Sequence, residues 1–259
     1  MKENQVIEYI VNWLKEYQVN SACDGFAIGI SGGIDSALTS TLSAKTGVPV
    51  LCIEMPIHQN FQEIARGKKH IQWLKNKYKN VESIETDLTG VFESFKNQSI
   101  SIKNKNNELA LANTKARLRM MNIYYYAQLH NYLVVGTGNK VEDFGIGFFT
   151  KYGDGGVDLS PIADLLKTEV YQLSSKLNIN DDILEASPTD GLWEENRTDE
   201  DQIGASYAEL EWAMNFDQKN QNEISEREKE ILSIYQSFNT KNYHKMTNIP
   251  VCKIPKDLK

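Results

Sequence analysis

The segment from Ser31 to Ser36, which reads SGGIDS, has residue types and a spacing that suit phosphate binding. It follows the apolar run of residues 26–30 and precedes a stretch with helical spacing, so we expect a turn from a buried strand into a helix. At the start of a helix, backbone N–H groups point outward and the helix dipole favours negative charge. The segment lacks both the lysine of a Walker loop and the GxGxxG pattern of a dinucleotide loop. The sequence therefore predicts a phosphate loop of another class.

Asp35 is the residue of this segment that needs an explanation, because a carboxylate repels phosphate. A carboxylate beside a polyphosphate is expected where Mg²⁺ lies between them. The alternative is that Asp35 only caps the first turn of the helix. The apolar strand before the segment and the helix after it favour the metal-binding interpretation.

Strands and helices alternate along the part of the chain that must position this loop. Apolar runs predict strands at residues 26–30, 48–55, 81–87 and 132–137. Apolar residues at helical spacing predict helices at residues 3–18, 34–45, 61–78 and 108–130, and more helix over 202–238. The strands are continuously apolar, which predicts the α/β class: a doubly wound parallel sheet with helices on both faces, Rossmann-like. Ligands of such sheets bind beyond the carboxyl ends of the strands.

The remaining segments have weaker patterns. Residues 96–107 are polar and predict an exposed loop, and the tail from residue 244 contains two prolines and predicts an extended chain. Residues 140–158 are glycine-rich, and residues 187–201 are acidic. We expect these last two segments to act as lids that keep water from a reactive intermediate.

Composition excludes several classes of protein. The 259 residues suit a single domain spanning residues 1–259 and contain no apolar run long enough for a membrane span. The N-terminus does not resemble a signal peptide, and Cys23, Cys52 and Cys252 form no CxxC pair, so we expect a cytoplasmic protein. The net charge of −7 argues against a nucleic-acid partner.

Two motifs carry a resemblance to known families. SGGIDS after an apolar strand resembles the loop of the N-type ATP pyrophosphatases, which transfer AMP and release pyrophosphate. Residues 134–173, which include GFFTKYGDGG, resemble the NAD synthetase family within that superfamily. NTKARLRM (113–120), SPTDGLWE (187–194) and YHK (243–245) match further elements of the family in the same order. The fold implied is adenine nucleotide alpha hydrolase-like.

The resemblance implies roles for individual residues. Asp35 and Glu142 would bind Mg²⁺, Asp154 would lie where ammonia attacks, and Lys167 would join Asp35 and Asp154 as a catalytic group. The residues implied in ATP binding are Gly29, Ile30, Ser31, Gly32, Gly33, Ile34, Asp35, Ser36, Thr137, Lys167 and Thr189. Those implied in binding deamido-NAD are Arg117, Lys151, Asp158, His244 and Lys245.

Ordinary structural roles are the alternative for several of these residues taken singly. Glu142 and Asp158 could be solvated loop acids, Arg117 a partner in a surface ion pair, Lys151 a snorkelling side chain and His244 an exposed tail residue. The collinear order of the motifs favours the functional interpretation. One departure is that Gly138–Lys140 follows the VGT motif, where the family often has Asp-His, so local contacts near Glu142 are expected to differ.

The activity implied is amidation of deamido-NAD by ammonia, with ATP as co-substrate and an NAD-adenylate as intermediate. The family also implies a homodimer, and 259 residues leave no room for a glutaminase domain. One alternative is another ATP pyrophosphatase, either GMP synthetase-like or tRNA-thiolating, although the three cysteines are poorly placed for thiolation. A non-catalytic nucleotide-binding protein is a further alternative, but it would need fewer acids than this chain carries.

Overall fold

A four-stranded parallel sheet forms the centre of the molecule. The computed structural model describes residues 1–99, 106–189, 191–192, 198–217 and 224–259. The strands are β1 (Gly25–Gly29), β2 (Val50–Glu54), β3 (Val81–Glu85) and β4 (Tyr132–Val134), in the order β3-β2-β1-β4. Phe26 of β1 pairs with Val50 on one side and with Leu133 on the other. The α/β class and the parallel sheet predicted from the apolar runs are confirmed.

Strand β4 ends earlier than its apolar run predicts. Beyond Val134, the chain makes only an isolated bridge between Val135 and Leu159. The backbone N–H of Gly136 then donates to the carbonyl of Leu159 at 2.8 Å. Val135 stays attached to β1, because its N–H donates to the carbonyl of Ala27 at 3.0 Å, and residues 135–137 line the cavity described below.

One face of the sheet is covered by four helices. They are α1 (Glu3–Ser21), α2 (Ile34–Lys45), α3 (Phe61–Lys77) and α6 (Lys167–Lys176). Leu14, Leu38, Leu74 and Leu173, one from each helix, are fully buried in the same cluster as Phe26 of the sheet. Burial of side chains of this size is the main favourable contribution to folding, at about 1.5–3 kcal/mol each. It fixes the start of α2, and with it the SGGIDS turn.

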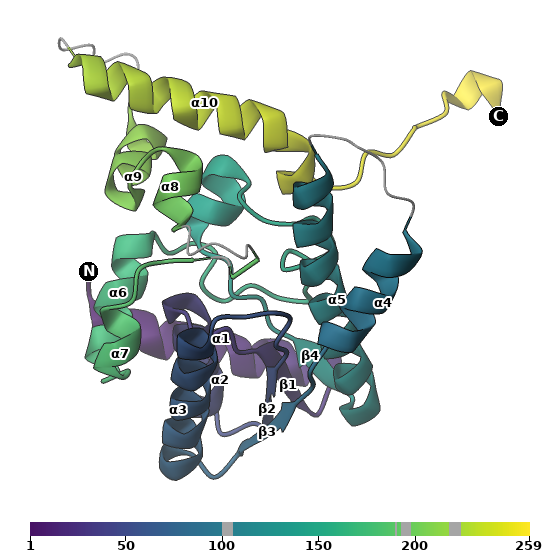
Figure 1. Cartoon of the computed structure of the whole chain (residues 1–259), viewed down its shortest axis with the longest axis vertical. Helices are drawn as coiled ribbons and strands as arrows, with labels where there is room; N and C mark the ends of the chain where they lie inside the picture. The colour runs from purple at the N-terminus through teal and green to yellow at the C-terminus, as the bar shows by residue number, and fades with distance from the viewer. Residues whose placement is uncertain (100–105, 190, 193–197, 218–223) are drawn as a thin grey trace.

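The opposite face is covered by α4 (Thr89–Gln98) and α5 (Asn107–His130). Helix α4 corrects the prediction of a loop from residue 96, because the helix continues to Gln98. Phe92 is buried against this face, whereas the other two apolar side chains of the helix, Val91 and Phe95, are exposed. The rest of the predicted loop lies largely outside the described residues. Figure 1 shows α4 and α5 together on the side of the sheet away from α3.

A separate helical group completes the fold. It contains the π-helix η1 (Val141–Ile146), α8 (Asp199–Ile203), α9 (Tyr207–Asn215) and α10 (Glu226–Met246), packed around Ile146, Leu210 and Ile231. Figure 1 shows α8, α9 and α10 grouped at one end of the molecule. The short helices α7 (Asp181–Leu184) and η2 (Lys256–Leu258) lie outside this group of contacts.

This group corrects two predictions made from the sequence, the single helical stretch and the start of the extended tail. The helix expected over 202–238 is two helices, each started by a serine cap, Ser206 and Ser225. The glycine-rich segment 140–158 contains η1, and the acidic segment 187–201 contains the start of α8. His244 and Lys245 lie in the last turn of α10 instead of an extended tail, because Asn239 and Asn242 donate to the carbonyls of Gly145 and Ile146 and hold this end of the helix against η1. No helix of the described residues is both long and apolar enough to cross a membrane.

Candidate active site

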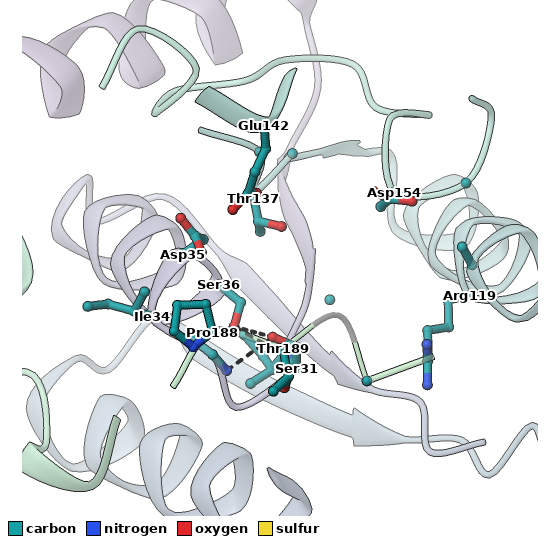
Figure 2. Close-up of a pocket in the computed structure, with 18 of the residues that line it drawn as sticks. Ser31, Ile34, Asp35, Ser36, Arg119, Thr137, Glu142, Asp154, Pro188 and Thr189 are labelled. Carbon is teal, nitrogen blue, oxygen red and sulfur yellow. Dashed lines mark hydrogen bonds between the residues drawn. The ribbon is translucent and has the colours of Figure 1, made fainter. Parts of the chain in front are cut away.

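The predicted ATP-binding residues meet in one cavity at the carboxyl ends of β1, β2 and β4. The cavity has a volume of about 260 Å³. Its wall includes most of the SGGIDS turn, together with Thr137, Glu142, Asp154, Lys167 and Thr189. Figure 2 shows Asp35 and Glu142 on either side of Thr137, with Asp154 on the far side of the cavity. Segments more than a hundred residues apart in the sequence therefore share one site.

The SGGIDS turn is held in shape by its own hydrogen bonds. The Ser31 hydroxyl accepts from the N–H of Gly33 at 3.1 Å, and the Ser36 hydroxyl donates to the carbonyl of Gly33 at 3.0 Å. The two serine hydroxyl oxygens lie 3.1 Å apart (Figure 2). Gly32 has a φ of +84°, and a Cβ at this position would lie 2.3 Å from the carbonyl oxygen of Glu63. The turn is thus held by internal hydrogen bonds, and Gly32 is required sterically.

Helix α3 and the segment around Thr189 close the loop from the other side. The Thr189 hydroxyl donates to Glu63 at 2.7 Å, and the Nε of Arg66 donates to the carbonyl of Gly32 at 3.3 Å. Figure 2 shows Thr189 beside Ser31. The structure therefore places Thr189 next to the phosphate loop, as the sequence predicts.

Lys167 joins the two acids that were predicted to bind metal. Its Nζ lies 2.6 Å from Oδ2 of Asp35 and 3.0 Å from Oε1 of Glu142, and the side chain is 3% exposed. Burial alone would lower the pKa of Lys167, but the two carboxylates raise it above its usual value. Burial opposes ionisation of Glu142, yet Lys167 and the hydroxyl of Tyr207 hold the pKa of that carboxyl below its usual value. Burial raises the pKa of Asp35 above its usual value, with Glu142 adding to the effect and Lys167 opposing it, so Lys167 is the group that favours the ionised form of both carboxyls.

Asn139 holds these two acids together, a role that the sequence did not indicate. The residue is fully buried, and its Nδ2 donates to Oδ1 of Asp35 at 3.0 Å. Its Oδ1 accepts from the N–H of Glu142 at 3.2 Å. Asn139 lies in Gly138–Lys140, the segment that departs from the family pattern. Its hydrogen bonds to Asp35 and Glu142 are the local contacts made by that segment.

Tyr207 is a second residue that the sequence did not indicate. Its hydroxyl lies 2.5 Å from Oε1 of Glu142 and 3.0 Å from Oδ2 of Asp199, and Nζ of Lys167 lies 4.6 Å from the centre of its ring. The residue is 5% exposed. It follows Glu142 by 65 positions, so only the folded chain brings the two side chains together.

Two further aspartates line the same cavity. Asp154 accepts from the N–H of Thr150 at 3.0 Å, and burial of its carboxyl, the largest cause, raises its pKa to about 6. Asp143, on η1, stands so close to Gly138 that a Cβ there would lie 2.2 Å from its carboxylate. Burial first, and then Glu142 and Asp154, raise the pKa of Asp143 to about 8. Asp154 was predicted, whereas Asp143 was not.

The residues predicted to bind deamido-NAD form a neighbouring group outside the cavity wall. Arg117 Nε donates to the carbonyl of Lys151 at 3.3 Å, and Nζ of Lys151 donates to the carbonyl of His244 at 2.8 Å. Nζ of Lys245 donates to the carbonyl of Phe149 at 2.6 Å. These four cationic or titratable groups therefore come together from α5, the turn at 150–153 and α10.

Asp158, the fifth predicted residue of this set, lies apart from the other four. It accepts from the hydroxyl of Tyr124 at 3.0 Å and from the N–H of Val134 at 2.8 Å. Of the two arginines in NTKARLRM, it is Arg119 that lines the cavity, while Arg117 does not (Figure 2). The helical register of α5 decides this difference, which the motif by itself does not show.

The model of the NAD synthase family matches residues 6–248. The chain belongs to the NAD synthase family. It is 40% identical to an NH(3)-dependent NAD(+) synthetase of Carboxydothermus hydrogenoformans, over 79% of this chain and 82% of that one. It is 39% identical to the enzyme of the same name of Methanosarcina acetivorans, over 81% and 78% of the two chains. Family membership confirms the resemblance and makes the protein a ligase that uses ATP in NAD biosynthesis.

Solved structures of the family have the same fold. The NMN synthetase of Francisella tularensis superimposes with a TM-score of 0.87 at 31% identity, covering 98% of this chain and all of that one (100%). The NH3-dependent NAD synthetase of Campylobacter jejuni superimposes with a TM-score of 0.78 at 25% identity and the same coverage, 98% and 100%. The adenine nucleotide alpha hydrolase-like fold expected from SGGIDS is consistent with these neighbours.

Proposed function

We propose that the protein converts deamido-NAD, ammonia and ATP into NAD, AMP and pyrophosphate. The observation that carries the proposal is the convergence of the SGGIDS turn, the Asp35–Lys167–Glu142 cluster and Asp154 on one cavity. Anion-binding groups and acids at that spacing suit transfer of AMP to a carboxylate followed by attack of ammonia. The curated relatives carry the same activity in their names.

The first step is attack of the substrate carboxylate on the α-phosphorus of ATP. A carboxyl oxygen forms a bond to phosphorus as the bond to the bridging oxygen breaks, and pyrophosphate leaves. Such a displacement depends on positioning and on charge neutralisation more than on a covalent catalyst. The N–H groups of the SGGIDS turn would hold the departing phosphates, and Lys167 would neutralise part of their charge.

Asp35 and Glu142 are the residues that would hold Mg²⁺. Both carboxylates point toward one position, which Lys167 Nζ contacts, and oxygen donors are what Mg²⁺ prefers. The donor set therefore fits the ion. When bound, Mg²⁺ supplies positive charge against the triphosphate.

The second step is attack of ammonia on the acyl carbon, with AMP as the leaving group. Ammonia must lose a proton, since the tetrahedral adduct would otherwise expel the amine. Asp154 lies across the cavity from the phosphate loop (Figure 2), where it could bind ammonium and accept that proton. Its role is proposed from this position and from the family motif GFFTKYGDGG.

The group of Arg117, Lys151, His244 and Lys245 is the proposed site for deamido-NAD, with Asp158 as a further contact. Deamido-NAD carries a pyrophosphate and a carboxylate, and cationic side chains are suitable partners for both. In the structure, the side chains of Arg117, Lys151 and Lys245 donate to backbone carbonyls, which a negatively charged ligand would replace.

A homodimer is also proposed, on the basis of helix α5. Met121, Tyr125 and Leu129 follow one another at a spacing of four, and their exposures are 54%, 60% and 62%. A stripe of this kind on one helix face is typical of a surface that packs against another subunit. The three free cysteines agree with a reducing, cytoplasmic location, which stays a prediction.

Amidation of the mononucleotide, nicotinate mononucleotide, is a second candidate. The specific observation in its favour is the NMN synthetase of Francisella tularensis, whose TM-score of 0.87 exceeds the 0.78 of the Campylobacter jejuni NAD synthetase. The two activities share the same chemistry and differ in the size of the group attached to the nicotinate ribose.

Incubation with ATP, Mg²⁺ and an ammonium salt tests both candidates. Deamido-NAD and nicotinate mononucleotide are supplied separately, and the amide product and pyrophosphate are measured. The first candidate predicts pyrophosphate release that depends on deamido-NAD, with the higher kcat/KM for that substrate. A higher kcat/KM for the mononucleotide would establish the second candidate, and pyrophosphate release independent of both would contradict both.

A further inference from the structure

The Nζ atom of Lys167 occupies the position at which a metal ion would meet Asp35 and Glu142. It lies within hydrogen-bonding distance of both carboxylates, at 2.6 Å and 3.0 Å. The lysine side chain is 3% exposed, and the aspartate and glutamate side chains are 18% and 17% exposed. A free metal ion would therefore have to displace a buried ammonium group from its two counter-charges.

We propose that Lys167 makes the metal site selective for metal already bound to nucleotide, because its ammonium group holds Asp35 and Glu142 until a polyphosphate draws it away. The proposal rests on the proposed metal site and adds to it a residue that decides which form of the metal is accepted. In this scheme the free ion is rejected and the metal–ATP complex is admitted.

The number of protein ligands supports this selectivity. Among the residues that the structure describes, no group of three or more histidine, cysteine, aspartate or glutamate side chains is arranged to hold a metal. Asp35 and Glu142 offer two carboxylates, whereas Mg²⁺ demands six ligands in near-ideal octahedral geometry and gives up water reluctantly. Phosphate oxygens would supply further ligands. The free ion gains too few contacts here to replace Lys167.

A bound polyphosphate would also give the ammonium group of Lys167 a new anionic partner. A buried ammonium group that loses its partners is strongly disfavoured, so Lys167 leaves the carboxylates only when another anion is in reach. Lys167, Gly33 and Ser36 line the same cavity, so phosphates held by the SGGIDS turn would offer that anion. The two exchanges are therefore coupled: metal replaces lysine on the carboxylates, and phosphate replaces the carboxylates on lysine.

The two carboxylates have other partners that would keep them in place after the exchange. Asn139 donates to Asp35 at 3.0 Å, and the hydroxyl of Tyr207 lies 2.5 Å from Glu142. Asn139 is fully buried and Tyr207 is 5% exposed, so both contacts belong to the packed interior. Departure of Lys167 would then leave an ordered pair of metal ligands.

Binding of Mn²⁺ alone, without nucleotide, tests the proposal. Free Mn²⁺ is followed by its electron paramagnetic resonance signal during titration of the full-length wild type, of Lys167→Met and of Lys140→Met. Lys140 is a matched control, since it sits near Glu142 but pairs with the exposed Asp164 at 2.8 Å. We expect Lys167→Met to bind Mn²⁺ at least about tenfold more tightly than the wild type, and Lys140→Met to match the wild type. Equal affinity of all three proteins would overturn the proposal.

Two further comparisons separate failure of this proposal from failure of the metal site itself. If the tighter binding in Lys167→Met persists in Lys167→Met/Asp35→Asn, the ion binds elsewhere and the proposed metal site is wrong. If Lys167→Met does not fold, the wild type is compared with Asp35→Asn. Equal binding of Mn²⁺ alone by these two proteins is expected, because Lys167 closes the site. Tighter binding by the wild type would overturn the proposal while leaving the metal site in place.

Discussion

Asp35 and Asp154 line the same cavity but have different surroundings. Asp35 lies 2.6 Å from the ammonium group of Lys167, whereas Asp154 accepts from a backbone N–H and has its pKa raised to about 6. A carboxylate whose ionised form is favoured by a neighbouring cation suits metal binding. An acid whose pKa lies near neutrality suits proton transfer. The two residues are therefore expected to serve different steps.

Replacement of Asp154 should separate the two half-reactions. In Asp154→Ala the phosphate loop and Lys167 remain, so one equivalent of pyrophosphate should still be released in the first turnover. Amide formation should fall by about 10²- to 10⁴-fold, the range for a lost general base. Rapid-quench measurement of pyrophosphate and amide checks this, with Asp35→Ala as the variant expected to lose both steps. Equal loss of both steps in Asp154→Ala would refute the division of labour.

The pH dependence of the amide step should follow the ionisation of Asp154. Burial raises its pKa from 3.8 to about 6, so the basic form accumulates as the pH rises through 6. The single-turnover rate of amide formation should therefore increase between about pH 5 and pH 7 and then level off. Asp154→Asn should lack this rise, whereas Asp164→Asn, at an exposed position, should keep it. A profile unchanged in Asp154→Asn would contradict the role.

At the scale of elements, the helices and strands that could be predicted from the sequence are those whose buried residues recur at a regular spacing. Helix α2 begins and ends at the predicted residues, β1 is shifted by one residue, and the other three strands are shorter than predicted. Helix α4 was missed because it buries a single side chain, Phe92, and therefore shows no repeated apolar spacing in the sequence. The contacts of Asn139 and Tyr207 could not be predicted, because they depend on how η1 and α9 pack together and not on local spacing.

The turn between β1 and α2 provides a test at this scale. Gly32→Ala should abolish ATP binding and lower the free energy of unfolding by about 1–3 kcal/mol, since it combines a φ of +84° with a Cβ 2.3 Å from a backbone oxygen. Gly47 is the matched control, with a φ of +78° and nothing within 4 Å of its Cβ position. Gly47→Ala should lose about 1–2 kcal/mol of stability and keep ATP binding. Calorimetric ATP titration and urea unfolding measure the two effects, and normal ATP binding by Gly32→Ala would count against a close-fitting phosphate loop.

At the scale of the whole molecule, the exposed stripe on α5 is the feature that an isolated subunit leaves unexplained. Tyr125→Glu places a charge at its centre, at a residue that is 60% exposed. A charge buried at a subunit contact is strongly disfavoured, so we expect dissociation to monomers and loss of activity. Tyr9→Glu is the control, because Tyr9 is 73% exposed on α1, away from the stripe. Sedimentation velocity measures the oligomeric state of the wild type and of both variants. A wild type that sediments as a monomer would contradict the homodimer.

The central claim is that the substrate carboxylate attacks the α-phosphorus of ATP in the cavity formed by the SGGIDS turn, Asp35, Glu142 and Lys167. Deamido-NAD with a heavy oxygen isotope in its nicotinate carboxyl group tests this step directly. Mass spectrometry of the products should find one labelled oxygen in AMP and none in pyrophosphate, because the carboxyl oxygen stays on the α-phosphorus when ammonia displaces AMP. Label in pyrophosphate or inorganic phosphate, or its complete absence from AMP, would contradict transfer of AMP to the carboxylate.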